Sequence, residues 1–272
     1  MSRPEIGKSI VTGKFTTNYL EVGEGFPIIF IHGSGPGVSA YANWRLVLPK
    51  ISEVGHCYAP DMLGFGYSDK PTDVKYGMKL WTQQIVDFMD ALKIEKADFV
   101  GNSFGGSLAL SMVINYPERV RKLVMMGPMG VEFDISYGLN EVWGYQPSKK
   151  NMLKLIELFC YNQEYATEEL AETRYRASTE PGFQEAFSSM FPEPRQNSVD
   201  DMSFTDEQIK TVKNDTMIVH GREDKVIPVD NAFKLIKLID NAELHIFGHC
   251  GHWTQIERAD DFAKLVKYFI GK

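Results

Sequence analysis

Short apolar runs rich in β-branched residues alternate along the chain with longer segments of helical periodicity. The runs begin at Pro27, His56, Ala97, Val120, Thr216 and Ala242. They are apolar at consecutive rather than alternate positions, which is typical of parallel strands covered on both faces. Between them, residues 80–92 place apolar side chains on one helical face, and residues 105–115 form a second helical pattern that stops before Pro117. The alternation predicts an α/β fold with a mainly parallel sheet.

Two segments depart from this rhythm. Residues 9–21 are predicted to form a hairpin that turns near Gly13 and pairs antiparallel at the sheet edge. Residues 130–204 contain helical stretches such as NMLKLIELF and TEELAETRYRAS, and the proline-rich MFPEPRQ, in place of strands. We expect an all-helical cap over the carboxyl ends of the strands, where open α/β sheets bind ligands. A peripheral helical decoration is the alternative. The predicted boundaries are a core of residues 1–130 and 206–272 and a cap of residues 131–205.

Residues 101–106, GNSFGG, lie where a strand-like run becomes a helix-like one. They fit G-x-S-x-G, in which small residues on either side of a serine let the backbone bend sharply between strand and helix. Such a turn exposes the serine hydroxyl at the top of the sheet, beside a helix N-terminus. Ser103 is therefore a candidate nucleophile, and a simple helix N-cap is the alternative.

A serine nucleophile needs a base to take its proton and an acid to orient that base. On this kind of turn the partners follow in the chain order serine, acid, histidine. Asp224 comes just after a predicted strand end, with the adjacent Glu223 as its rival. His252 lies in a loop after the last strand and directly precedes a helix-like tail, which favours it over His249.

Neither a metal nor a dinucleotide is expected. The sequence HCGH offers two metal ligands but no third at a suitable spacing, and its glycine disfavours a helix. The loop IHGSGPG departs from the dinucleotide fingerprint at Pro36 and lacks a convincing ribose-binding acid. Its glycines instead free backbone N–H groups for an oxyanion, and we expect the donors to be Ser34 and Phe104. His32 is expected to brace this loop by hydrogen bonds.

Composition narrows the class of protein further. The 272 residues suffice for one large domain, and a formal net charge of −7 argues against a sequence-independent grip on nucleic acid or on an anionic membrane. Cys57, Cys160 and Cys250 are odd in number and lack CxxC spacing, so they predict neither a disulfide framework nor a thiolate metal site. The N-terminus lacks a signal-peptide pattern, and no apolar run approaches a membrane span. We therefore expect a soluble cytoplasmic protein.

Several of these motifs together resemble one family. HGSGPG with SAYANW, then GNSFGG, HGREDKVIP and GHCGHWTQIE, are similar to the meta-cleavage product hydrolases, the carbon–carbon bond hydrolases of aromatic catabolism in the α/β-hydrolase superfamily. The similarity runs from about Gly25 to the C-terminus and includes the cap at GLNEVWGYQPS. It is strongest to the branch acting on monocyclic substrates. The resemblance implies an eight-stranded sheet with the cap inserted after the sixth strand, no cofactor, and suggests a homo-oligomer.

The resemblance also implies a reaction and a set of site residues. The substrate would be of the 2-hydroxy-6-oxohexa-2,4-dienoate type, split by water into 2-hydroxypenta-2,4-dienoate and a carboxylic acid. The family pattern makes Ser103, Asp224 and His252 the catalytic triad. It assigns the binding of the dienoate carboxylate and 2-oxygen to Arg174, Asn102, Asn43 and Trp253. Arginine offers a planar two-pronged grip on a carboxylate, and Arg176 competes for that role.

The pocket for the 6-substituent is expected to be apolar. Its candidate residues are Met129, Leu139, Val142, Trp143 and Val226, and ordinary core packing is the alternative for each. A long Met129 side chain would favour hydrogen or a small alkyl group over phenyl.

Two other functions fit the same fold. A general carboxylesterase would share the triad but have no carboxylate clamp, and a non-catalytic ligand-binding protein is the alternative of another class. Haloalkane dehalogenases are excluded, because they place a carboxylate where Ser103 stands. The sequence leaves open whether Ser103 forms an acyl-enzyme or helps a water to attack directly.

Overall fold

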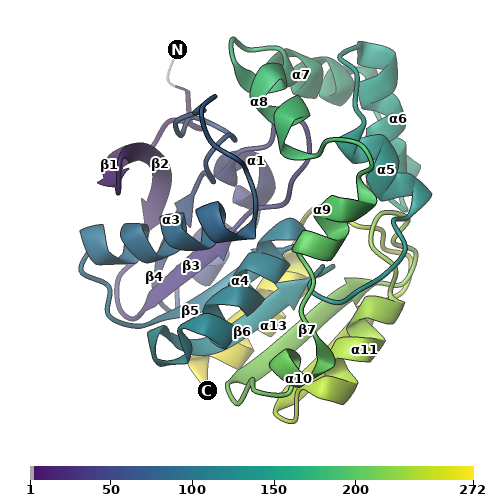
Figure 1. The fold of residues 1–272 in the computed structure, drawn as a ribbon. Helices are drawn as coiled ribbons and strands as arrows, with labels where there is room; N and C mark the ends of the chain where they lie inside the picture. Colours follow the sequence, from purple (N-terminus) through teal and green to yellow (C-terminus); the bar gives the residue numbers. More distant parts are fainter. Residues whose placement is uncertain (1–2) are drawn as a thin grey trace.

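A computed structural model describes residues 3–272, and its centre is one eight-stranded sheet (Figure 1). The strand order is β1-β2-β4-β3-β5-β6-β7-β8. The pairs β1–β2 and β2–β4 are antiparallel, and all the other neighbours are parallel. The strands are β1 (Lys8–Thr12), β2 (Phe15–Val22), β3 (Pro27–Ile31), β4 (His56–Pro60), β5 (Ala97–Asn102), β6 (Val120–Met126), β7 (Asp215–Gly221) and β8 (Ala242–Phe247). The predicted fold class and edge hairpin are confirmed.

Both faces of the sheet are covered, which explains the continuous apolar runs. In β3, Ile29 and Ile31 pack into one buried cluster, whereas Ile28 and Phe30 pack into another on the opposite face. Figure 1 shows α3 and α4 in front of the sheet and α13 behind it. The first cluster includes residues of α3 (Met78–Ala91), α4 (Phe104–Asn115) and α11 (Asp230–Leu238). The second includes residues of α1 (Ala40–Trp44), α2 (Leu48–Ile51) and α13 (Ala259–Gly271).

Between β6 and β7 the described chain forms helices and no strand. Within residues 131–205 these are α5 (Tyr137–Trp143), α6 (Lys149–Phe159), α7 (Glu168–Ser178), α8 (Phe183–Met190) and α9 (Gln196–Asp201), with a 3₁₀ turn at Gln163–Tyr165. Ser136, Ser148 and Thr167 each accept a backbone N–H from the first turn of the helix they precede, so the sequence itself sets these helix starts. Figure 1 shows α6, α7 and α8 at the top of the molecule, away from the sheet. We call residues 131–205 the cap segment, and this division into cap and core stays a prediction.

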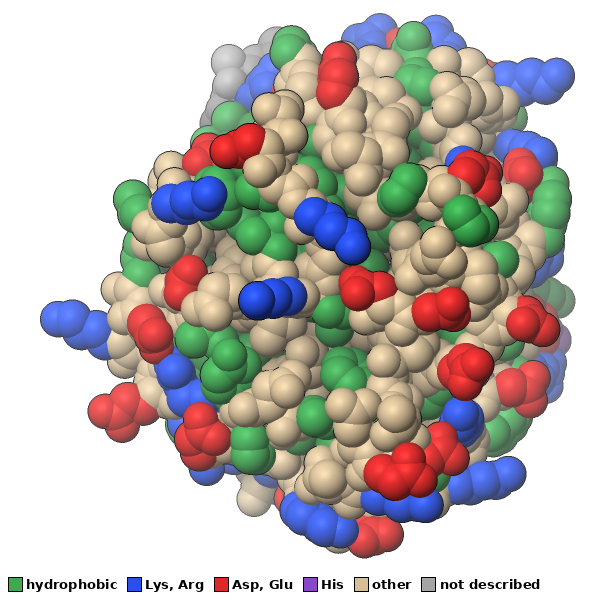
Figure 2. Space-filling view, in the orientation of Figure 1, with side chains coloured by type: hydrophobic (Ala, Val, Ile, Leu, Met, Phe, Trp, Pro, Cys, Tyr) green, Lys and Arg blue, Asp and Glu red, His purple; other side chains and the backbone are tan. Residues whose placement is uncertain are grey.

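The remaining elements connect these layers. They are the 3₁₀ turn Pro117–Arg119, α10 (Asp206–Ile209) and α12 (Thr254–Glu257). The helix expected at residues 80–92 is α3, and the one expected at residues 105–115 is α4, which begins one residue earlier. No helix within residues 3–272 is both long enough and apolar enough to cross a membrane. Figure 2 shows acidic and basic side chains interspersed over the face in view.

Candidate active site

Ser103 lies on a strained turn between β5 and α4. Its φ of 56° and ψ of −115° place a non-glycine residue in a region that L-residues seldom adopt. A Cβ on Gly101 would lie 2.2 Å from the carbonyl oxygen of Gly105, and one on Gly105 would lie 2.2 Å from that of Ile31. Both flanking positions of the G-x-S-x-G motif therefore require glycine.

The backbone of Ser103 is fixed by the segment that follows β6. Its N–H donates to the Met126 carbonyl at 2.8 Å, and its carbonyl accepts the Met129 N–H at 3.2 Å. Ser103 precedes α4, but its side chain makes no capping hydrogen bond with that helix. The N-cap alternative therefore lacks its defining contact, and the hydroxyl is available for chemistry.

His252 is hydrogen-bonded to Asp224, with 2.7 Å between Nδ1 and the carboxylate Oδ2. The other oxygen of Asp224 accepts the backbone N–H groups of Val226 at 2.7 Å and Ile227 at 2.9 Å. The rival acid Glu223 instead accepts the Cys250 N–H at 3.1 Å. The structure thus pairs His252 with Asp224 and directs Glu223 elsewhere.

A second imidazole supports the same carboxylate. Burial by itself would raise the pKa of Asp224, but the imidazoles of His252 and His220 hold that pKa well below its usual range. His220 Nε2 lies 3.2 Å from Asp224 Oδ2 and 3.0 Å from the Ile227 carbonyl oxygen. Sequence reasoning missed His220, although it stands four residues before Asp224 at the end of a strand. Asp224 therefore carries its charge near neutral pH and can orient His252.

The Ser103 turn and the His252–Asp224 pair both lie against the segment at the end of β6. Gly127 has a φ of +52°, and a Cβ there would lie 3.3 Å from the His252 ring and 3.4 Å from Asp224 Oδ2. Gly127 lies between Met126 and Met129, the two residues that form hydrogen bonds with the Ser103 backbone. One short segment thus contacts all three members of the predicted triad.

Glu257 holds the loop that carries His252, and the sequence reasoning did not single it out. One of its carboxylate oxygens accepts the Gly251 N–H at 2.8 Å. The other accepts the N–H groups of Tyr161 at 2.9 Å and Asn162 at 2.8 Å, which belong to the cap segment. Glu257 is the last residue of GHCGHWTQIE and its only acid, which was the available signal. The carboxylate joins the cap segment to the histidine loop.

The loop after β3 lies beside the nucleophile. A Cβ on Gly33 would be 2.9 Å from the Asn102 side-chain oxygen, and Asn102 directly precedes Ser103. Ser34 follows in this loop, and its Oγ accepts the indole N–H of Trp143 at 3.0 Å. Phe104 is the first residue of α4. The predicted oxyanion donors therefore come from two neighbouring segments, and their role stays a prediction.

His32 contacts both sides of this loop. Its Nδ1 lies 2.6 Å from the Gly33 carbonyl oxygen, and its Nε2 accepts the Met62 N–H at 2.9 Å. Burial lowers the pKa of His32 to about 4, against the opposing hydrogen bond to Gly33. His32 is therefore neutral near pH 7, and its two contacts match the bracing role expected for it.

A cavity of about 150 Å³ brings together three of the four predicted carboxylate-binding residues, Asn43, Arg174 and Trp253. The fourth, Asn102, donates instead to the Met126 carbonyl at 3.3 Å. The side-chain N–H group of Asn43 is buried without a partner among the described residues. The cavity thus offers unused hydrogen-bond donors to a ligand.

The two candidate arginines of α7 differ in their surroundings. Arg174 donates to the Pro36 carbonyl at 3.3 Å and forms no ion pair with a carboxylate in the described part of the chain. Burial lowers the pKa of Arg174 to about 10, so it still carries its charge near neutral pH. Arg176 is exposed and is paired with Glu172. The structure therefore favours Arg174 for binding an anion.

The five apolar residues predicted for the 6-substituent pocket are all buried. Met129, Leu139, Val142, Trp143 and Val226 are each at most 3% exposed and belong to one cluster that extends from the core into the cap segment. Trp143 also stacks on Phe191, with ring centroids 4.3 Å apart. Burial is consistent with both pocket lining and core packing, so the pocket role stays a prediction.

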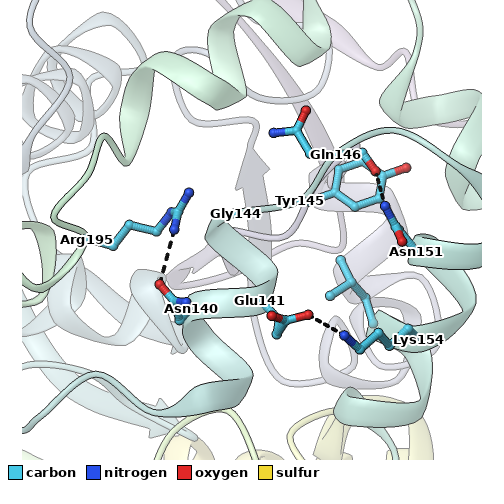
Figure 3. A pocket seen from close by; sticks show the side chains of 9 residues that line it. Asn140, Glu141, Gly144, Tyr145, Gln146, Asn151, Lys154 and Arg195 are labelled. Carbon is cyan, nitrogen blue, oxygen red and sulfur yellow. Dashed lines mark hydrogen bonds and ion pairs between the residues drawn. The ribbon is translucent and has the colours of Figure 1, made fainter.

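A separate cavity of about 170 Å³ lies within the cap segment and is lined by none of the predicted carboxylate-binding residues (Figure 3). Figure 3 shows Arg195 directed toward Asn140 and Lys154 directed toward Glu141. The first pair lies at 3.2 Å and the second at 2.6 Å. Because its two cations already have partners, this cavity is a poorer anion site than the one at Arg174.

Metal-ligand clusters and reactive thiols are the other chemistry to consider in the described chain. Residues 3–272 contain no group of three or more His, Cys, Asp or Glu side chains arranged to hold a metal ion. The three cysteines are buried and unpaired. Burial raises the pKa of the Cys250 thiol, which lies two residues before His252, to about 12. Cys250 is therefore a protonated thiol and a poor rival to Ser103 as nucleophile.

Comparison with known proteins agrees with this geometry. Residues 27–259 match the alpha/beta hydrolase fold family. The chain is 50% identical over 269 residues to 2-hydroxymuconate semialdehyde hydrolase of Pseudomonas sp. (strain CF600), covering 99% of this chain and 95% of that protein. It is 48% identical over 266 residues to 2-hydroxy-6-oxo-2,4-heptadienoate hydrolase of Pseudomonas putida (strain F1), covering 98% and 96%.

A solved structure is equally similar. The meta-cleavage product hydrolase CumD of Pseudomonas fluorescens IP01, solved as its S103A mutant complexed with acetates, superimposes with a TM-score of 0.97 at 55% identity. The match covers 98% of each chain. The present chain belongs to the alpha/beta hydrolase fold family and, within it, to the meta-cleavage product hydrolases.

Proposed function

We propose that this chain hydrolyses the carbon–carbon bond between C5 and C6 of 2-hydroxy-6-oxohexa-2,4-dienoate-type compounds, which arise by extradiol cleavage of catechols. The products are 2-hydroxypenta-2,4-dienoate and a carboxylic acid, which is formate when the 6-substituent is hydrogen. The names of two relatives, one for 2-hydroxymuconate semialdehyde and one for the heptadienoate, support this substrate class. We also predict that the protein acts in aromatic catabolism in the cytoplasm and forms a homo-oligomer.

One observation carries the proposal against a general carboxylesterase. Arg174 is a charged side chain in a cavity with Asn43 and Trp253, and no carboxylate of the described chain neutralises it. An uncharged ester gives such a cation no partner, whereas the carboxylate of a dienoate supplies two oxygens that match a guanidinium. The cavity therefore favours an anionic substrate.

The catalytic cycle that we propose begins with a proton transfer. Cleavage of a carbon–carbon bond needs an electron sink, so the bound dienol first becomes a ketone, with loss of the 2-hydroxyl proton and protonation at C5. His252 carries this proton, and Asp224 keeps its imidazole in the required tautomer at 2.7 Å. The 2-oxo group then conjugates with C5 through the C3–C4 double bond.

Cleavage follows attack on the C6 carbonyl. Oxygen adds to C6 from Ser103 or from a water that Ser103 and His252 activate, and the N–H groups of Ser34 and Phe104 stabilise the oxyanion. The C5–C6 bond then breaks, and its electron pair moves into the 2-oxo group to give the dienolate of the first product. Both routes consume one water. Acid quench during turnover separates them, because only the covalent route leaves an acyl group on Ser103.

The proposal is tested by loss of the yellow dienolate absorbance with the ring-cleavage products of catechol, 3-methylcatechol and 2,3-dihydroxybiphenyl. Wild-type protein should bleach the first two rapidly and the 6-phenyl compound more slowly, because the long Met129 side chain limits the pocket. Ser103→Ala should lose hydrolysis, and a nitrophenyl ester measures general esterase activity alongside. Rapid ester hydrolysis with no bleaching would replace the proposal with a carboxylesterase. Equal or faster turnover of the 6-phenyl compound would contradict the size limit assigned to Met129 in the 6-substituent pocket.

A further inference from the structure

A second hollow adjoins the cavity that contains Arg174. Its volume is about 460 Å³, and it is lined by residues of both α7 and the segment around α1. The two spaces share Ala42, Arg45, Leu170 and Arg174 in their linings. We call the larger space the outer hollow and the smaller one the inner cavity. We call these shared residues the boundary between the two spaces.

The rim of the outer hollow has two arginines whose charges are already balanced. Arg3 is paired with Glu180 at 3.2 Å, and Arg176 is paired with Glu172. These exposed pairs are in contact with solvent and contribute little to the attraction of an anion.

The two arginines at the boundary differ from those at the rim. Arg45 donates to the Ala42 carbonyl at 2.5 Å, and Arg174 donates to the Pro36 carbonyl at 3.3 Å. Within residues 3–272 neither forms an ion pair with a carboxylate. Both therefore lack an ion-pair partner at the boundary, although the carboxylate of Glu5 also lines the outer hollow.

The two boundary arginines come from different parts of the chain. Arg45 directly follows α1 of the core, whereas Arg174 lies on α7 of the cap segment. The two arginines are close enough to each other that the positive charge of Arg45 contributes to the lowered pKa of Arg174. Two like charges that face one shared space repel each other, and a carboxylate between them offsets that repulsion.

We propose that Arg45 is the first contact for the substrate carboxylate on a path that leads from the outer hollow to Arg174. This inference rests on the proposed function, because it assumes an anionic dienoate substrate. Arg45 attracts the carboxylate at the core side of the boundary, and Arg174 then receives it in the inner cavity. Charge at a concave access path raises the association rate of an oppositely charged ligand, and salt reduces the effect.

The kinetic test compares Arg45→Gln with Arg176→Gln, which removes a paired charge from the same hollow. The ratio of kcat/KM for the 6-methyl dienoate to kcat/KM for a neutral nitrophenyl ester should fall about tenfold in Arg45→Gln at low ionic strength. The loss should shrink in 0.5 M salt, and Arg45→Lys should restore most of it. An equal loss for both substrates, a loss independent of salt, or the same ratio as in Arg176→Gln would overturn the proposal.

A binding measurement keeps this test separate from the proposed reaction. Sorbate, hexa-2,4-dienoate, carries the dienoate carboxylate but has no bond to be cleaved, and Trp253 in the inner cavity provides a fluorescence signal. Stopped-flow association of sorbate should be about tenfold slower in Arg45→Gln than in wild type. An unchanged association rate, or no binding by wild type, would contradict the role of Arg45. Failure of wild type to bleach the dienoate would instead contradict the proposed function.

Discussion

The core side and the cap side of the candidate active site are held by different interactions. In the core, Asp224 accepts two backbone N–H groups as well as the imidazole of His252, and Ser103 is bound through its backbone on both sides. In the cap segment, the Arg174 side chain makes one hydrogen bond within residues 3–272, at 3.3 Å to a backbone carbonyl. Fixed groups suit bond making and breaking, and a cation without a carboxylate partner suits binding. The comparison therefore places the proposed chemistry in the core, and in the cap segment the arginine proposed to hold the substrate carboxylate.

The largest effect is expected from Asp224→Asn. The amide is nearly the same size but donates where the carboxylate accepted, so His252 loses its tautomer and the stabilisation of its charged form. We expect kcat for the 6-methyl dienoate to fall about 10³- to 10⁴-fold while KM changes little. Thermal unfolding provides the control for misfolding. A loss of tenfold or less in a folded variant would break the assignment of chemistry to the core.

Arg174→Gln should change KM more than kcat, which is the reverse of the effect expected for Asp224→Asn. Removal of the charge should raise KM for the dienoate about tenfold to a hundredfold, with a smaller change in kcat, because a charge-assisted hydrogen bond contributes about 1.5–3 kcal/mol. Steady-state kinetics of Arg176→Gln, two residues along the same helix, supply the matched control. Unchanged kinetics in Arg174→Gln would remove this residue from the site.

Glu257→Gln tests the connection between the two sides. An amide has only one accepting oxygen, so it leaves at least one of the N–H groups of Gly251, Tyr161 and Asn162 without its partner. We expect the free energy of unfolding to fall by about 1–3 kcal/mol and kcat to fall up to tenfold. Denaturant unfolding and steady-state kinetics measure the two effects. Glu157→Gln, a change at an exposed position of α6, is the control. Equal stability and equal kcat in the two variants would contradict a positioning role for Glu257.

The effect furthest from the chemistry is a pH-dependent change in stability at His32. The folded pKa of about 4 lies below the ordinary 6.5, so the unfolded chain binds the proton between these values and stability is lost as pH falls through them. The free energy of unfolding of wild type should exceed that of His32→Gln by about 2 kcal/mol less at pH 4.5 than at pH 7. The raised pKa of buried Asp61, about 6, acts with the opposite sign but is common to both proteins. Denaturant titrations at the two pH values measure the difference, and a constant advantage would contradict a neutral His32.

Local patterns predicted the core side well. The continuous apolar runs indicated the two-sided sheet, and the glycines around Ser103 indicated the sharp turn, because backbone geometry there excludes any side chain. Asp224 and His252 were found from their order and their positions after strand ends. His220 and Glu257 were missed, because their contacts join segments that only the folded chain brings together.

The cap side was less predictable. Arg174 and Arg176 are two residues apart on α7, so they point in nearly opposite directions. The residue pattern favoured neither, and only the family resemblance favoured Arg174. The packed structure separates them, with one in the inner cavity and the other exposed beside Glu172. The sequence does not distinguish the two roles of Met129 and Val142 for a different reason: pocket lining and core packing require the same apolar side chains.

Product analysis tests the central claim most directly, because bleaching alone would also follow from ketonisation without cleavage. The 6-methyl dienoate should be turned over in ¹⁸O-labelled water by wild type and by Ser103→Ala. Our account predicts equimolar 2-hydroxypenta-2,4-dienoate and acetate from wild type, with at least one acetate oxygen from the water, and neither product from Ser103→Ala. Recovery of the intact seven-carbon ketone from wild type, or undiminished acetate from Ser103→Ala, would contradict it.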